Sequence, residues 1–199
     1  MVYYPIIRPP LDRPFLDQPF REMSKEELRE YANWFHSIIP HRIKILEKAV
    51  KGSLGFESWK ADMSPESLDP LSRWFEKQVE TRKKTKEELE ADRALLGKFG
   101  EPEDWTITER TASIAFDVGI YFGQVVLVNV PGAKWSQVLR GKRNFDYGKP
   151  VIIYPGGVPL EPINIIIVSA FKVARGKSAN FRKLYDNNVE RLKGEPFQP

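Results

Sequence analysis

The chain has 199 residues, 41% hydrophobic and 12% aromatic, and this composition excludes a protein that is disordered throughout. It contains no cysteine, which excludes disulfides, thiolate metal sites and cysteine nucleophiles and is typical of a reducing compartment, so we expect a cytoplasmic protein. The net charge of +4 is uneven, because residues 134–199 hold twelve Lys and Arg against five Asp and Glu. The length fits a single domain, 1–199.

Residues 1–22 form a proline-rich segment, with five prolines in the first twenty positions. Proline donates no backbone hydrogen bond, so we expect an extended arm rather than a helix or a central strand. Tyr4, Ile6 and Ile7 predict that the arm packs on the surface of the domain. It lacks a basic stretch followed by an apolar one, so no signal peptide is expected.

Residues 23–129 are predicted to be mainly helical. Ser24 and Glu27 have the spacing of a capping box, so a helix is expected to begin there, with Pro40 kinking or ending it. A second helix is expected from Ser64, with Pro65 at its first position.

A charged run at residues 82–93 follows, RKKTKEELEADR. Thr85 and Glu88 again have capping-box spacing and predict a short exposed helix to about residue 98. A basic nucleic-acid-binding peptide is the alternative, but the interleaved glutamates disfavour it.

The segment from Thr108 to Asn129 predicts a central helix that is apolar on nearly every side and therefore buried. Small residues recur every fourth position, at Ala115, Gly119 and Gly123, and should allow another element to pack closely. Asp117 and the two glycines argue against a membrane span, so no membrane partner is expected.

One face of this central helix carries a polar stripe, made of Ser113, Asp117, Tyr121 and Gln124. A buried aspartate needs a partner, so we interpret Asp117 first as an anchor that accepts hydrogen bonds from backbone or arginine groups and pins the hairpin region to the helix. The stripe can also line a pocket or be the patch that a partner contacts. General acid–base chemistry would need a second titratable group, and only Glu109 lies nearby in sequence.

Residues 130–199 are predicted to form a small antiparallel sheet and a C-terminal helix. Strands are expected at 134–139 and 149–154, and the helix at 179–193. The run NIIIVSAFKVA at 164–174 is predicted to be a strand running into a turn or helix, because its β-branched start favours a strand. The predicted fold class is α+β, with a helical N-terminal two thirds and a small antiparallel sheet packed on the central buried helix.

The segment 134–149, KWSQVLRGKRNFDYGK, combines five basic residues with three aromatic ones. This composition fits an exposed hairpin with inward aromatic rings, a protein interface, or a surface that binds phosphates and stacks on bases. The candidate binding residues are Asp117, Tyr121 and Gln124 of the stripe with Trp135, Arg140, Lys142, Arg143, Phe145 and Tyr147 of this segment.

Sequence motifs for catalysis are missing. His36 and His41 are five apart with Pro40 between them, so they do not form the paired ligands of a helical metal site. No nucleophile elbow, P-loop or dinucleotide-binding glycine motif is present. We therefore predict no catalytic residue, no metal site and no cofactor, and we expect a protein that is not an enzyme.

Several blocks resemble an uncharacterised bacterial protein family, a domain of unknown function: FREMSKEELREYANWFHSIIPHRI, DMSPESLDPLSRWF with its SPESL core, and TASIAFDVGIYFGQV followed by a KPVIIY strand. The resemblance spans most of residues 15–170. Small proteins of this kind resemble immunity or accessory partners of bacterial toxins. The family has Glu where this chain has Gln124, which counts against catalysis here, and it supplies no catalytic residue.

These observations predict a non-enzymatic protein-binding module, with a toxin-immunity protein that blocks a partner's surface as its specific form. The alternative is a nucleic-acid-binding protein that uses segment 134–149. A second alternative is an enzyme with Asp117 in a pocket.

Overall fold

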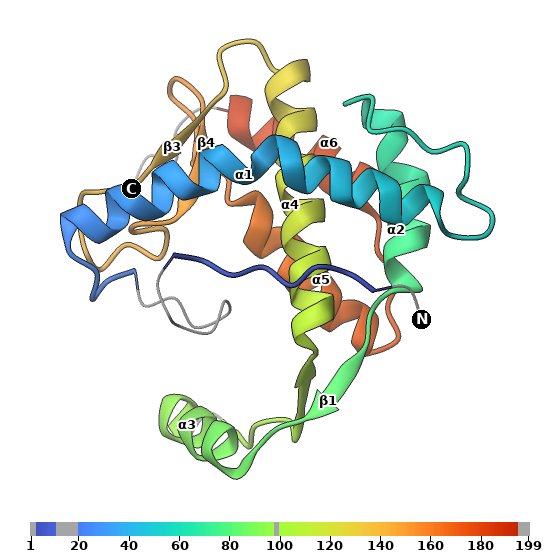
Figure 1. The fold of residues 1–199 in the computed structure, drawn as a ribbon. Helices are drawn as coiled ribbons and strands as arrows, with labels where there is room; N and C mark the ends of the chain where they lie inside the picture. Colours follow the sequence, from blue (N-terminus) through green and yellow to red (C-terminus); the bar gives the residue numbers. More distant parts are fainter. Residues whose placement is uncertain (1–2, 11–19, 98–99, 195–199) are drawn as a thin grey trace.

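A computed structural model describes residues 3–10, 20–97 and 100–194 of the chain. The fold is α+β, as the sequence predicts, and the described residues form six α-helices and two small two-stranded antiparallel sheets. The central helix lies at the middle of the fold, and the other described helices lie around it except the one at residues 86–96 (Figure 1). The parts of the predicted arm at residues 1–2 and 11–19 lie outside the described residues.

Helix α1 spans Lys25–Lys51 and begins with the predicted capping box of Ser24 and Glu27. The helix does not end at Pro40, which was one of the two expected outcomes, because α1 is one helix through that residue. Pro40 and His36 are both on the exposed side of the helix, so water can hydrogen-bond the His36 carbonyl group that lacks a backbone donor. Phe35 and Leu46, on either side of the proline, are buried and hold both halves of the helix against the core.

The next helical segment begins at Ser64, which caps it as predicted by accepting a hydrogen bond from the Ser67 N–H group. Its first turn is a 3-10 helix, η2 (Pro65–Ser67), which continues as α2 (Leu68–Glu76). Leu68, Leu71 and Phe75 are fully buried, and this apolar face fixes α2 on the core.

Two short strands that were not predicted carry the charged helix away from the core. Strand β1 (Thr81–Lys83) pairs antiparallel with β2 (Trp105–Ile107), and the register places Arg82 opposite Thr106. Between them lies α3 (Lys86–Leu96), which begins with the predicted capping box at Thr85 and buries none of its residues. Figure 1 shows α3 at the end of a projection from the body of the fold. The predicted helix end near residue 98 lies outside the described residues.

Helix α4 (Glu109–Asn129) is the predicted central helix, and most of its residues are buried. By length and composition it is apolar enough to cross a membrane, but 83% of its most apolar stretch is buried inside this fold. Its glycines permit close packing, as expected: a Cβ atom at Gly119 would lie 2.7 Å from the Cα atom of Ile163. A Cβ atom at Gly123 would lie 2.5 Å from the Trp135 ring.

The two predicted strands of the C-terminal region form an antiparallel pair, β3 (Lys134–Gln137) and β4 (Pro150–Ile153). The strand predicted at the start of residues 164–174 is wrong, because α5 (Pro162–Ala174) is helical throughout. Ile166, Ser169 and Ala170 are buried at helical spacing on this helix, which packs along α4. Each β-branched residue costs a helix only a few tenths of a kcal/mol, and burial of its side chain offsets that cost.

The last described helix is α6 (Phe181–Lys193), close to the predicted helix, with Asn180 as its N-cap. Gly194 follows the last turn, and the residues beyond it lie outside the described part of the chain. Residues 3–10 of the N-terminal arm contain no helix or strand, and Tyr4 and Ile7 are buried against the core. The arm therefore contributes to the interior of the protein.

Candidate functional site

Asp117 lies at the centre of a buried polar network. Its side chain is 0% exposed, and it accepts two hydrogen bonds from Arg42, from Nε to Oδ1 and from Nη2 to Oδ2, both of 2.7 Å. The Tyr4 hydroxyl group donates a further hydrogen bond to Oδ2. Arg42 also donates to the carbonyl oxygen of Pro5 at 3.0 Å. The arginine partner expected for Asp117 is therefore present.

The network connects α4 to segments other than the one that was expected. Asp117 links α4 to α1 through Arg42 and to the N-terminal arm through Tyr4, whereas the hairpin region was expected to be the partner. Burial raises the pKa of the Asp117 carboxyl group to about 6, and the hydrogen bonds and charge of Arg42 oppose this rise. Since no part of Asp117 is exposed, a substrate reaches its carboxylate only if Tyr4 or Arg42 moves.

The other residues of the polar stripe contact separate segments. Ser113 accepts a hydrogen bond of 3.1 Å from the backbone N–H group of Ile7 in the arm. The Tyr121 hydroxyl group accepts one of 3.2 Å from the Met63 N–H group and lies 2.6 Å from Ser67 Oγ. Gln124 is only half-buried. The stripe therefore joins segments of the fold and does not line one common site.

The basic-aromatic segment 134–149 is divided into a buried base and an exposed end. Trp135 packs on Gly123, with its ring centroid 5.1 Å from that of Phe35, and Tyr147 is buried. The Gln137 amide group donates to the carbonyl oxygens of Leu28 and Gly148, at 3.0 and 2.7 Å. Two of the three aromatic rings therefore point into the protein.

The exposed end, residues 139–145, is named the basic lobe below. Phe145 is 64% exposed and Leu139 is 52% exposed. Arg140, Lys142 and Arg143 are exposed beside them, and none of the three forms a salt bridge with another described residue. The structure thus places five apolar or cationic side chains close together in sequence on one exposed loop.

A partly buried ion pair lies beside the basic lobe. Lys149 Nζ is 3.7 Å from the centroid of the Phe145 ring and 3.1 Å from Glu161 Oε2. Burial raises the pKa of the Glu161 carboxyl group to about 7, and the charge of Lys149 opposes this rise. Lys149 thus fixes the position of Phe145 relative to the start of α5.

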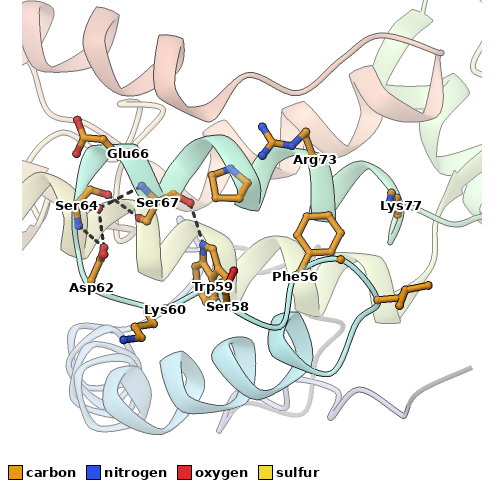
Figure 2. A pocket seen from close by; sticks show the side chains of 13 residues that line it. Phe56, Ser58, Trp59, Lys60, Asp62, Ser64, Glu66, Ser67, Arg73 and Lys77 are labelled. Carbon is orange, nitrogen blue, oxygen red and sulfur yellow. Dashed lines mark hydrogen bonds between the residues drawn. The ribbon is translucent and has the colours of Figure 1, made fainter.

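The structure also contains a cavity of about 600 Å³ that sequence reasoning missed. It lies between α2 and the loop that connects α1 to Ser64, and Figure 2 shows the side chains around it. Phe56 and Trp59 line it, and both residues are mostly buried. The sequence signal for this cavity was the pair of aromatic residues in the loop that ends at the Ser64 cap. It was not sufficient, because only tertiary packing determines that both side chains face the same cavity.

No group of three His, Asp or Glu side chains in the described part of the chain is placed to hold a metal ion. His36 and His41 are exposed on α1. No protein-family model, curated protein or solved structure matches the chain.

Proposed function

We propose that this protein is a non-enzymatic binding module that uses the basic lobe to cover an acidic surface on a partner protein. The observation that carries the proposal is the exposure of Phe145 and Leu139 among three cations that have no anionic partner in the described residues. Exposed aromatic and arginine side chains are the usual anchors of protein interfaces. Their positive charge favours a partner of opposite sign.

The shape of segment 134–149 supports a protein partner over a nucleic acid. Sequence-tolerant binding to single strands uses several exposed aromatic rings on which bases stack. Here Trp135 is packed on Gly123 and Tyr147 is buried, so neither ring offers a free face. Phe145 remains, and Lys149 covers one of its faces. The exposed part of this one ring is enough to fill a pocket on a partner protein, as an aromatic interface anchor does.

The base of the lobe is fixed by hydrogen bonds, so binding would order few residues. The Gly148 N–H group donates to the Val138 carbonyl oxygen at 2.8 Å and closes the loop. The Asn144 N–H group donates to the Gly141 carbonyl oxygen at the same distance, within the lobe. A surface that is already ordered loses less conformational entropy when it binds.

The identity of the partner is proposed from the resemblance described above. A protein of the toxin-immunity kind blocks its toxin by covering a surface that the toxin needs, and this mechanism requires no catalytic residue in the blocking protein. An acidic surface on the toxin would match the basic lobe.

The test is affinity purification from the native host at physiological salt with three forms of the protein. The lobe variant Arg140→Glu/Lys142→Glu/Arg143→Glu should lose a partner that the wild type retains at one-to-one stoichiometry. A control variant with the same charge change elsewhere, at Lys25, Lys44 and Lys177, should retain it. The control positions are exposed and form no salt bridge with another described residue. Equal loss in both variants, or no stoichiometric partner, would contradict the proposal.

The second candidate is nucleic-acid binding, favoured by the same three unpaired cations. It predicts that affinity for a labelled single-stranded oligonucleotide falls steeply as the salt concentration rises, because bound counterions are released. The lobe variant should then bind weakly and the control variant normally. A weak interaction that does not respond to salt would exclude this function.

A further inference from the structure

The cavity beside α2 has the size of a small-molecule site. Its volume of about 600 Å³ lies within the range of pockets that bind small ligands. One wall is the loop from Leu54 to Asp62, and the other is formed by η2 and α2 (Figure 2). It lies on a different part of the fold from the basic lobe and requires its own explanation.

The walls of this cavity are held in place by hydrogen bonds to the core. Trp59 Nε1 donates to the Ser67 carbonyl oxygen at 3.0 Å, which joins the two walls. Tyr121 of α4 fixes Met63 and Ser67 from below. Met63 has a φ of +60°, a conformation that costs a non-glycine residue about 1 kcal/mol or more, and it alone among the described non-glycine residues has a positive φ. The cavity is therefore formed before any ligand arrives.

The two acidic side chains at the cavity already have hydrogen-bond donors. Asp62 Oδ1 accepts from the N–H group and from the hydroxyl group of Ser64, and these bonds lower the pKa of its carboxyl group. Glu66 accepts from Arg182 of α6 at 2.8 Å, which lowers its pKa in the same way. Glu66 is thus paired with Arg182, whereas Asp62 keeps its negative charge and acts electrostatically on Lys60.

Three cationic side chains line the cavity and form no salt bridge with another described residue, although the first of them acts electrostatically on Asp62 and Glu47: Lys60, Arg73 and Lys77. Arg73 and Lys77 project from α2 near the Phe56 ring, and Lys60 lies toward the other end, near Asp62 (Figure 2). Cations near the C-terminal end of a helix are favoured by its dipole, which accounts for Arg73 in the last turn of α2 and for Lys77 directly after it. Lys60 on the opposite wall is influenced by Asp62, so Arg73 and Lys77 are the cations that a ligand can engage.

Apolar side chains complete the site. Phe56 and Trp59 form its floor, and Lys77 Nζ lies 5.0 Å from the centroid of the Phe56 ring. Leu54 at the rim is 92% exposed.

We infer that this cavity binds a small organic anion that has a flat apolar body and a carboxylate or phosphate group. The apolar body would lie over Phe56 and Trp59 with Leu54 against it. The oxyanion would accept hydrogen bonds from Arg73 and Lys77, because a guanidinium group matches the paired oxygens of either acid.

The test measures dissociation constants by ligand-observed NMR for three probes that share one ring system: 1-naphthylacetate, 1-naphthyl phosphate and the neutral 1-naphthylacetamide. Both anions should bind the wild-type protein about tenfold or more tightly than the amide, because only they engage the cations. Tighter binding of the acetate would identify a carboxylate ligand, and tighter binding of the phosphate a phosphorylated one.

Two exposed variants separate this site from general attraction to a basic protein. Arg73→Gln/Lys77→Gln should weaken both anions about tenfold and leave the amide unchanged. Lys44→Gln/Lys48→Gln has the same spacing and charge change on α1, away from the cavity, and should bind like the wild type. Equal binding of anions and amide, equal effects of the two variants, or no binding of any probe at millimolar concentration would overturn the inference.

Discussion

Replacing Arg42 with methionine tests the buried network most directly. The side chain of Arg42 is 8% exposed and that of Asp117 is 0% exposed, so the substitution leaves a carboxylate buried without its cation. Loss of one partner of a buried ion pair costs about 3–5 kcal/mol. A domain of this size is stable by about 5–15 kcal/mol in total. We therefore expect Arg42→Met to remove a large part of the free energy of unfolding at neutral pH.

The cost should shrink as the pH falls. Burial raises the pKa of Asp117 above its ordinary value of 3.8, and Arg42 partly opposes this rise, so its removal raises the pKa further. An acid whose pKa is raised by folding contributes most stability below its unfolded pKa and loses that contribution as the pH rises through the folded pKa. As the pH rises over this range, the free energy of unfolding falls more for the variant than for the wild type. Its deficit should therefore be smaller at about pH 5 than at about pH 7.

Urea unfolding at both pH values measures the effect. The control is the apolar replacement Tyr4→Phe/Arg42→Met/Asp117→Leu, which leaves no buried charge and should recover most of the lost stability. A loss of less than about 1 kcal/mol at neutral pH would refute the reasoning, since an exposed pair behaves that way. So would a deficit that stays constant or grows on acidification.

Three further changes test other parts of the fold. Gly119→Ala places a Cβ atom 2.7 Å from the Cα atom of Ile163, so despite the gain in helix propensity urea unfolding should show a net loss of about 1–2 kcal/mol. Thr85→Ala removes the cap of α3, and amide hydrogen exchange should become faster in that helix without a change in global stability, because α3 buries no residue. Burial raises the pKa of Glu161 to about 7 against the opposing charge of Lys149. The contribution of Glu161 to stability should therefore fall by about 3 kcal/mol as the pH rises from about 4 to about 8, and Glu161→Gln should abolish this part of the pH profile.

Helix starts were the most predictable features of this chain. A capping box is a local arrangement in which a side chain bonds a backbone group three residues away, so it can be identified from the sequence at Ser24 and Thr85. The central helix was equally clear, because a long apolar segment interrupted by small residues has few alternatives to burial.

The errors concern features that depend on contacts between distant residues. Helix α5 contains a β-branched run that favours a strand locally, but it packs along α4 at the close approach that Gly119 permits. Strands β1 and β2 are three residues each and exist only because they pair across α3. Pro40 removes one hydrogen bond on an exposed face, and packing of the two halves of α1 outweighs that loss. Local helix and strand propensities include neither helix–helix packing nor strand pairing, so they could not predict these features.

The candidate site was predictable in part for the same reason. The sequence identified segment 134–149, and the structure separates it into a buried base with Trp135 and an exposed end with Phe145. Alternation alone did not show which aromatic ring points outward. The cavity was missed because Phe56 and Trp59 face α2 only after the loop is folded against it.

The polar stripe on α4 connects the buried core with the cavity. Three of its residues bond segments outside α4: Ser113 bonds the arm, Asp117 the arm and α1, and Tyr121 the loop and η2. A buried polar group is stable only in the one arrangement that satisfies its hydrogen bonds, so the stripe specifies how these segments lie on the helix. Tyr121 holds Met63 in its strained conformation beside the cavity. The sequence predicted the stripe as a candidate binding patch. In the structure one of its residues, Tyr121, instead fixes the wall of the cavity that a ligand would contact.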